Sequence, residues 1–187
     1  MASADWHADL AADAYEEFFR RLKLRREQNL LDLSAGYDLI SVAAAQGLSV
    51  STVDSQKEIL EVARSRGKIA LEAETGSYGG VLCVGTFSSL PREYGAALSA
   101  EIERVLVPGG LVFCSFAPLW ARDPDGTHSV RTFFDREGRV YRRDHGRFGS
   151  YVVYQNREIE TLFRKMKLVS LVTQVNGARR LIAMKKG

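Results

Sequence analysis

The chain has 187 residues, of which 45% are hydrophobic and 26% are charged, a balance that excludes a disordered or fibrous protein. This length fits a single domain with one core. The net charge of +3 does not by itself indicate nucleic-acid binding, and no apolar run reaches the roughly 18 residues that cross a bilayer. We therefore expect one soluble, cytoplasmic domain over residues 1–187.

The first predicted element is an amphipathic helix over about residues 4–24. Apolar side chains recur every four residues from Trp6 to Leu22, with further apolar residues beside them. A stripe of this width is what a helix needs to pack against a core, and membrane or partner binding is the less favoured alternative. We expect this helix to pack on the sheet that the following residues predict.

From Leu30 to Phe116, short apolar runs alternate with longer stretches of helical periodicity. Runs rich in Val, Leu and Ile are typical of strands buried on both faces, and their alternation with helices predicts a parallel α/β sheet. The predicted strands are Leu30–Leu33, Leu48–Val53, Lys68–Glu72, Gly80–Val84 and Gly110–Phe116. The main predicted helices are Ser55–Arg66, Pro91–Leu106 and, later in the chain, Asn156–Met166.

The chain closes with two β-like runs, Leu168–Val175 and Ala178–Met184, on either side of Asn176-Gly177. Asn-Gly is the strongest short-range hairpin signal, because both turn positions need positive φ. The last two strands are therefore predicted to be antiparallel. A parallel sheet that ends in an antiparallel hairpin differs from the ordinary dinucleotide-binding sheet, whose strands are joined by helical crossovers.

Between Pro118 and Tyr154 the alternation breaks, which predicts an insertion with a hairpin around Asp135–Gly138. The insertion combines arginines and aromatic residues, a mixture that can bind RNA or an anionic small molecule. Acidic residues in the same hairpin favour an ordinary solvated surface instead. The arginines are Arg131, Arg136, Arg139, Arg142, Arg143 and Arg147, and the aromatic residues are Phe133, Phe134, Tyr141 and Phe148.

The loop after the first strand is the first candidate ligand site. Asp32 precedes the small residues Ser34, Ala35 and Gly36. At the first strand-to-helix turn of an open α/β sheet, backbone amides can approach a nucleotide-like ligand only where side chains are small. This loop is therefore predicted to bind such a ligand.

Asp54 and Ser55 follow the second strand, at about the distance from the loop where a ribose-binding acid is expected. A carboxylate at that position can accept hydrogen bonds from both ribose hydroxyls. The same two residues could equally cap the next helix, so the pattern alone leaves both roles open.

Four segments together resemble the successive motifs of class I S-adenosylmethionine-dependent methyltransferases. In chain order they are LLDLSAGYD, VSTVDSQKEILEVARSRG, GGVLCVGTFSSLP and EIERVLVPGGLVFCSF. With the closing hairpin, the resemblance covers most of residues 29–117 and 156–185. It implies a Rossmann-like, seven-stranded methyltransferase sheet, mostly parallel with a C-terminal antiparallel hairpin. It also implies an enzyme with S-adenosylmethionine as its cofactor.

The resemblance implies a role for each candidate site residue. Asp32 and the Ser34–Gly36 loop would face the methionine part of the cofactor, Asp54 its ribose, and Gly85-Thr86 the floor of the pocket. The segment between the third and fourth strands is short, and Glu72 and Glu74 are its acids available for the adenine. The implied cofactor-binding residues are Asp32, Ser34, Ala35, Gly36, Asp54, Ser55, Glu72, Gly85 and Thr86.

The glycine loop departs from the D-x-G-x-G-x-G pattern that this family favours. The chain keeps Asp32 and Gly36, and it has Ser34 and Asp38 in the outer glycine positions. Ser34 adds a side chain where close approach is needed, and Asp38 adds negative charge beside the amino acid part of the ligand. Both changes could lower the affinity for the cofactor.

No motif identifies a catalytic base, and holding the acceptor in line with the sulfonium can itself supply much of the acceleration. His128 lies in the insertion and is a possible base, although a surface histidine is the simpler interpretation. Cys83 and Cys114 lie in apolar runs and are predicted to be reduced core residues, and no cluster has metal-ligand spacing.

The leading hypothesis is methyl transfer to a small-molecule acceptor, with the N-terminal helix and the 118–154 insertion forming the acceptor pocket. Two alternatives remain. One is an RNA methyltransferase that uses the arginine-rich insertion, with tRNA as one candidate substrate. The other is a non-catalytic methyltransferase-like protein that binds a ligand or a partner, which the altered glycine loop favours.

Overall fold

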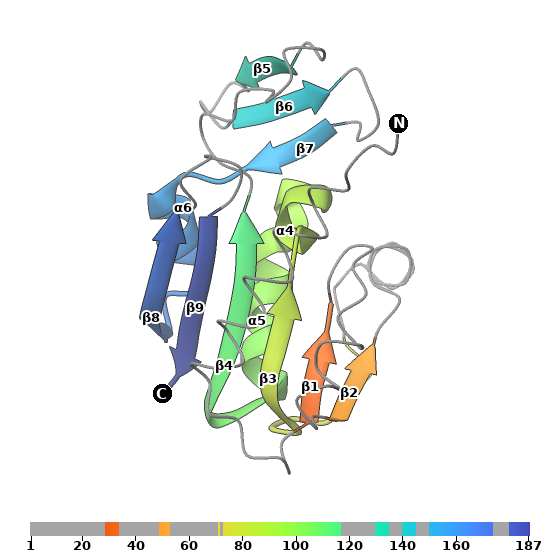
Figure 1. The fold of residues 1–187 in the computed structure, drawn as a ribbon, viewed down its shortest axis with the longest axis vertical. Helices are drawn as coiled ribbons and strands as arrows, with labels where there is room; N and C mark the ends of the chain where they lie inside the picture. Colours follow the sequence, from red (N-terminus) through yellow and green to blue (C-terminus); the bar gives the residue numbers. More distant parts are fainter. Residues whose placement is uncertain are drawn as a thin grey trace, which may run out of the picture.

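The computed structural model describes residues 29–33, 49–52, 71, 73–116, 130–134, 140–144, 150–173 and 180–187. These residues form two β-sheets, with helices packed on the larger one (Figure 1). The predicted N-terminal helix, the predicted helix Ser55–Arg66 and the turns Asp135–Gly138 and Asn176-Gly177 lie outside the described residues. Among the described helices, none has the length and apolar character needed to span a membrane.

The larger sheet has six strands among the described residues, in the order β2-β1-β3-β4-β9-β8. The first four in this order are parallel to one another, as the alternation of apolar runs and helices predicts. β9 is antiparallel to both of its neighbours. The strands are β1 (Asn29–Asp32), β2 (Ser49–Thr52), β3 (Tyr78–Cys83), β4 (Leu106–Phe116), β8 (Met166–Thr173) and β9 (Arg180–Lys186).

The predicted C-terminal hairpin is confirmed by the pairing of β8 with β9. The register joins Leu168 to Met184 and Thr173 to Arg180, with an irregularity after Leu168. β9 also pairs with β4 from Leu111 to Phe116, so the last strand is inserted between β4 and β8. The main sheet is therefore mostly parallel and closes in the antiparallel manner that the Asn-Gly turn predicts.

The expected seven strands are not present in the main sheet, which has six strands among the described residues. Leu71, the described residue of the predicted strand Lys68–Glu72, is not in a strand. Its N–H donates to Glu101 Oε2 over 2.9 Å, and its carbonyl accepts from Arg104 Nη2 over 3.1 Å. Both partners lie in the last turns of α5 (Gly95–Val105), which leads directly into the start of β4. These bonds hold Leu71 at the amino ends of the strands.

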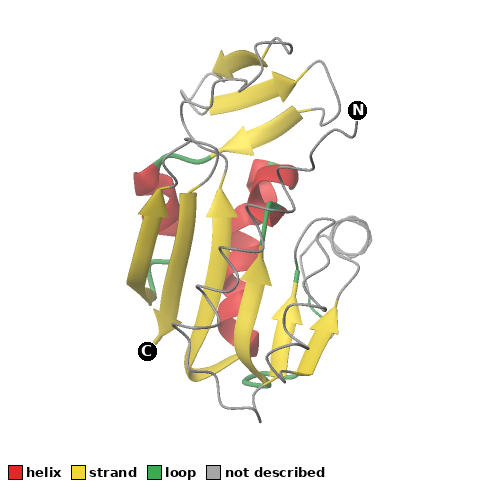
Figure 2. Cartoon of the chain, in the orientation of Figure 1, coloured by secondary structure: helices red, strands yellow, loops and turns green. Residues whose placement is uncertain are grey.

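Helices cover one face of the main sheet (Figure 2). After β3 come the short helix α4 (Thr86–Ser89), the 3₁₀ turn η1 (Arg92–Tyr94) and α5, so the predicted helix Pro91–Leu106 is divided near Gly95. α5 buries Leu98, Ile102 and Val105, which recur on one side of the helix, against the sheet.

The second predicted helix of this region, Asn156–Met166, is shorter than expected. α6 spans Asn156–Leu162, a turn follows, and Met166 begins β8. Its first turn has a capping box, in which the Gln155 side chain accepts from the Glu158 N–H and the Glu158 side chain accepts from the Gln155 N–H.

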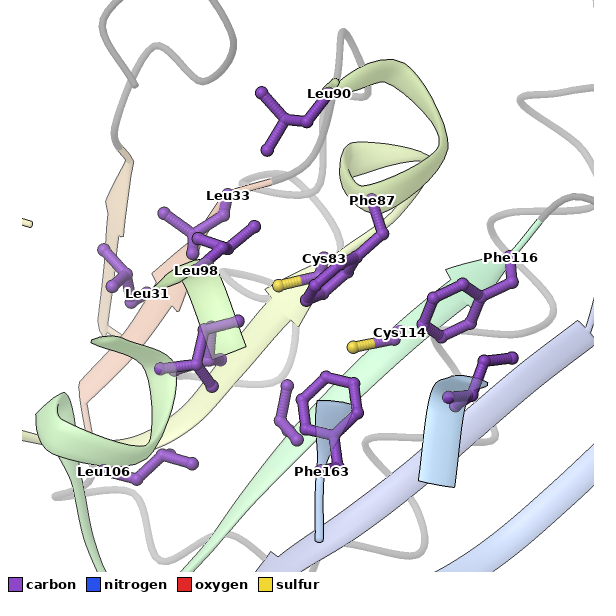
Figure 3. Packing of buried hydrophobic residues seen from close by; sticks show 14 of the residues in the cluster. Leu31, Leu33, Cys83, Phe87, Leu90, Leu98, Leu106, Cys114, Phe116 and Phe163 are labelled. Carbon is purple, nitrogen blue, oxygen red and sulfur yellow. The ribbon is translucent and has the colours of Figure 1, made fainter. Parts of the chain in front are cut away.

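The core lies between the helices and the sheet and contains a group of aromatic rings (Figure 3). The ring of Phe87 lies 5.4 Å from that of Phe116 and 5.5 Å from that of Phe163, measured between centroids. Cys83 and Cys114 are paired in register on β3 and β4, and both thiols are buried and free. The prediction that they are reduced core residues is therefore confirmed.

The insertion contains a separate antiparallel sheet with the order β5-β6-β7. Its strands are β5 (Val130–Phe134), β6 (Val140–Asp144) and β7 (Ser150–Val153). The register pairs Phe133 with Tyr141, so the strands predicted beside Asp135–Gly138 are confirmed. Figure 1 shows this inserted sheet beyond the carboxyl end of β4, the end at which the parallel strands finish.

Candidate functional site

The carboxyl ends of β1, β3 and β4 meet at one edge of the main sheet. Asp32, the last residue of β1, pairs with Leu82, and Cys83 at the end of β3 pairs with Cys114. Ligands of open α/β sheets bind at this edge, outside the ends of the strands. The Asp32 side chain is among the buried ones, with a residue exposure of 4%. The largely buried carboxyl group of Asp32 is therefore the first component of the candidate site.

Gly85 forms the turn between β3 and α4. Its φ of 72° lies in the left-handed region, which a residue with a Cβ atom adopts only with strain. Its N–H donates to Ser115 Oγ over 2.9 Å, across from the end of β4. The end of β4 therefore fixes the conformation of this turn.

Thr86 ties the same turn to β1. Its hydroxyl donates to the Leu33 carbonyl over 2.5 Å, and the Leu33 N–H donates to the Leu82 carbonyl over 2.8 Å. Thr86 is fully buried and Ser115 is almost so. Both hydroxyls thus make bonds within the protein, and their role at the site is to hold the backbone around Asp32 and Gly85 in place.

The Cys83 thiol lies directly under this edge. Burial raises the pKa of Cys83 well above its ordinary value, and its hydrogen bond with Cys114 and the negative charge of Asp32 raise it further. A thiol with a raised pKa stays protonated and is a poor nucleophile. Cys83 therefore contributes packing to the site and does not act as a nucleophile there.

Of the predicted cofactor-binding residues, the structure brings together Asp32, Gly85 and Thr86. Glu74 is described and exposed, and its neighbour Ala73 accepts from Arg104 Nη1 at the amino ends of the strands. This places Glu74 near the amino ends of the strands, at the edge opposite Asp32. The possible base His128 and the remaining predicted residues lie outside the described residues: Ser34, Ala35, Gly36, Asp54, Ser55 and Glu72.

The sequence prediction missed Ser115. It lies in the apolar segment VFCSF. The feature of the sequence that could have pointed to it is a single hydroxyl side chain within an apolar run that forms a strand. A polar side chain in a buried strand needs a hydrogen-bond partner, and here the partner is the Gly85 N–H. No spacing rule pointed to this pair, because the two residues meet only when β3 and β4 are side by side.

Arg92 was also missed, and it joins the site to the inserted sheet. Its side chain is 7% exposed and pairs with Glu158, while Nη2 donates to the Val153 carbonyl at the end of β7 over 2.9 Å. The guanidinium carbon lies 4.8 Å from the centre of the Tyr154 ring. That ring in turn makes edge contacts with the rings of Phe87 and Phe116. α4 and β7 are thus held together by charge and by aromatic packing.

No group of His, Cys, Asp or Glu side chains within the described ranges could hold a metal ion. What these ranges contain is a buried carboxyl group, a left-handed glycine turn and two hydroxyls that tie three strand ends together. Such an edge can bind the polar groups of a nucleotide-like ligand through its carboxylate and backbone.

A mostly parallel sheet with a C-terminal antiparallel hairpin and a glycine turn at its carboxyl edge has the fold of the class I S-adenosylmethionine-dependent methyltransferases. Solved structures support this conclusion over nearly the whole chain. Neither a scan against protein-family models nor a search of curated proteins finds a match to the sequence.

Three solved structures illustrate the similarity. The PH0226 protein from Pyrococcus horikoshii is 16% identical, with a TM-score of 0.70 over 100% of this chain and 93% of its own. An S-adenosylmethionine-dependent methyltransferase from Clostridium acetobutylicum is 14% identical, with a TM-score of 0.61 over 100% and 94%. The glycopeptide N-methyltransferase MtfA is 15% identical, with a TM-score of 0.62 over 94% and 90%. At these identities the similarity shows the fold.

Proposed function

We propose that this protein is an S-adenosylmethionine-dependent methyltransferase that acts on a small-molecule acceptor. The observation that carries the proposal is the connected edge formed by Asp32, Gly85 and Thr86 at the carboxyl ends of β1 and β3. MtfA, which has been solved with bound S-adenosylmethionine and with bound S-adenosylhomocysteine, shares the overall fold, and this supports the proposal. We further propose a single cytoplasmic domain over residues 1–187.

The residues at this edge fit the chemistry of the cofactor. The Asp32 carboxylate suits the ammonium group of the methionine part, because an acceptor-only group pairs well with a cation. Gly85 lacks a Cβ atom, so a ligand can approach the backbone of its turn closely. When bound, S-adenosylmethionine supplies an electrophilic methyl group on a sulfonium.

Three further assignments complete the proposed cofactor site. Asp54, with Ser55 beside it, would bind the ribose, and the Ser34–Gly36 loop would receive the methionine part. Glu72 is the acid that the motifs assign to the adenine. These assignments come from the sequence motifs.

The chain's own contribution to methyl transfer is to position groups and to exclude water. Thr86 and Ser115 fix the backbone on either side of the site, and Phe87, Phe116 and Tyr154 pack against one another in the core. Holding an acceptor in line with the methyl group supplies much of the acceleration that such a reaction needs, without a dedicated base. The inserted sheet and the N-terminal helix are proposed to hold the acceptor.

The decisive experiment is a calorimetric titration of the protein with S-adenosylmethionine and S-adenosylhomocysteine. We expect both ligands to bind, and Asp54→Ala to weaken S-adenosylhomocysteine by about 1–3 kcal/mol, the usual cost of losing hydrogen bonds to a charged group. Asp144→Ala, which removes a carboxylate in the inserted sheet, is the matched control and should bind normally.

Absence of binding by the folded wild-type protein would refute the enzyme proposal. It would favour the non-catalytic alternative, which the residues Ser34 and Asp38 in the glycine loop support. An unchanged dissociation constant in a folded Asp54→Ala variant would refute the ribose assignment alone.

A further inference from the structure

The strand β8 forms one outer edge of the main sheet. Among the described residues it pairs with β9 alone, and Figure 1 shows it at the side of the sheet. An edge strand presents backbone N–H and C=O groups that can pair with another extended chain. Lys167 of β8 pairs with Lys185, which in turn pairs with Leu111, well before the carboxyl end of β4. The first half of β8 is therefore away from the candidate site.

This edge exposes two large apolar side chains. Leu168 is 52% exposed and Val169 is 56% exposed, and these two are the exposed large hydrophobic residues in the part of the chain that the structure describes. Val169 has no register partner on β9, because the pairing shifts between Leu168 and Ser170. A contact that covers these side chains would remove apolar surface from water, which is favourable.

The same edge is basic. Lys167 and Lys185 are directly opposite one another in the register, so they share a face of the sheet, and both are exposed. Neither β8 nor β9 contains an acid, and within the described ranges no carboxylate forms an ion pair with either lysine. Lys165 differs, because its ammonium group pairs with Glu103 over 3.7 Å. Like charges opposite one another destabilise a sheet, and a carboxylate beside them would relieve this cost.

The charge and the apolar surface together define the chemistry of a partner. Lys167 and Leu168 are consecutive, and successive residues of a strand point to opposite faces. A chain laid beside β8 would therefore place one residue next to Lys167 and the following residue next to Leu168. An acid followed by an apolar residue satisfies both positions. Lysines on an edge also oppose pairing with a second copy of β8, which has no acid to offer them.

We propose that the edge of β8 binds an extended segment of a partner protein, which adds to the sheet as a further strand with an acidic residue beside Lys167 and an apolar residue beside Leu168. In this mode of recognition, main-chain hydrogen bonds supply the affinity and alternate side chains supply the specificity. The proposal does not depend on the proposed methyltransferase function, because the edge is away from the candidate site.

The test uses the full chain and four synthetic peptides of equal length, with binding followed by fluorescence anisotropy. The first peptide alternates glutamate with valine, the second lysine with valine, and the third glutamate with serine. The fourth is an N-methylated form of the first, which keeps the side chains and lacks the backbone donors that a strand needs. Wild-type protein should bind the glutamate–valine peptide about tenfold more tightly than the other three.

The variants change exposed side chains, so the fold should be retained. Lys167→Glu should weaken the affinity for the glutamate–valine peptide about tenfold and strengthen that for the lysine–valine peptide, because an attractive cross-strand pair becomes repulsive. Leu168→Ser should weaken the first affinity about fivefold through loss of the apolar contact. Arg157→Glu, on α6, makes the same change in net charge as Lys167→Glu and is the matched control, which should bind like the wild type.

Four results would overturn the proposal: no preference of the wild type for the glutamate–valine peptide, equal binding of its N-methylated form, an unchanged affinity in Lys167→Glu, or an equal loss in Arg157→Glu. A wild-type dimer in sedimentation that Leu168→Ser dissociates would also overturn it and assign this edge to a second copy of the chain. Salt-dependent binding of bulk tRNA that Lys167→Glu abolishes would overturn it in favour of a nucleic-acid surface.

Discussion

Arg92 donates a hydrogen bond to the Val153 carbonyl over 2.9 Å, and this bond joins the turn after α4 to the last residue of the inserted sheet. The same guanidinium group pairs with Glu158 in α6 and lies over the ring of Tyr154. One side chain therefore contacts the end of β7, the link that follows it and the first turn of α6. The position of the inserted sheet therefore depends on a nearly buried charge.

Replacement of this group should loosen the inserted sheet. We expect Arg92→Met to lower the free energy of unfolding by about 1–3 kcal/mol, because it removes the donor to the buried Val153 carbonyl and the ion pair with Glu158. Hydrogen exchange at the amides of β7 should accelerate more than exchange in β3. Lys165→Met, which removes an exposed ion pair with Glu103, is the control and should change stability by less than about 0.5 kcal/mol. Equal exchange in β7 of the Arg92→Met variant and the wild type would contradict the positioning role.

Gly95 begins α5 at a point of close contact. A Cβ atom there would lie 2.7 Å from the Tyr154 hydroxyl oxygen and 3.4 Å from Leu162 Cδ2. Alanine normally stabilises a helix relative to glycine by about 1 kcal/mol, but the clash with a buried ring should make Gly95→Ala destabilising by about 1–3 kcal/mol. Urea denaturation measures the change, and a gain in stability would show that Tyr154 moves aside freely.

A comparison with Gly76→Ala separates crowding from backbone strain. Gly76 has a φ of 66°, and a Cβ atom added there would meet no other atom within 4 Å, so only strain opposes the substitution. We expect a cost of about 1 kcal/mol there. A cost at Gly95 smaller than that at Gly76 would mean that contact with Tyr154 is not the dominant effect.

The Thr86 hydroxyl should matter more than its methyl group. Thr86→Val retains the shape and removes the donor to the Leu33 carbonyl, so we expect a loss of about 1–2 kcal/mol in the free energy of unfolding. Thr86→Ser keeps the hydroxyl and should be closer to the wild type. S-adenosylhomocysteine affinity should follow the same order. Equal ligand affinity in both variants would show that this bond stabilises the fold without shaping the site.

The raised pKa of Cys83 predicts a loss of stability at alkaline pH. The unfolded chain releases the thiol proton at the ordinary value of about 8.5, while the folded chain retains it. Stability from this group is therefore complete below about pH 8.5 and declines as the pH rises toward the folded-state pKa. Cys83→Ala should make the decline between neutral and alkaline pH less steep in denaturant titrations. An identical slope in the variant and the wild type would rule out this linkage.

The sequence predicted those parts of the fold that depend on local patterns. Apolar runs located β1, β3 and β4, and Asn176-Gly177 predicted the antiparallel end of the sheet. The predicted strand at Lys68–Glu72 was wrong at Leu71, whose backbone instead bonds to Glu101 and Arg104. Those bonds join residues thirty or more positions apart, so a local apolar pattern could not reveal them.

The residues of the candidate site likewise include some that the sequence indicates and some that it does not. Asp32, Gly85 and Thr86 could be placed at the carboxyl edge from the sequence because they end or follow strands, and such residues meet at one edge of a parallel sheet. Ser115 and Arg92 were not found, because their partners Gly85 and Val153 come from other elements.

The location of β9 between β4 and β8 has a consequence for biosynthesis. β9 follows every other described strand in sequence, yet it fills an interior position of the sheet, and the Lys186 ammonium group donates to the Leu106 carbonyl over 2.7 Å. While the chain is being synthesised, β4 and β8 have no neighbour between them until β9 has left the ribosome. The edge of β4 that β9 later covers is therefore exposed from the synthesis of β4 until that of β9, and chaperones would be needed most during that interval.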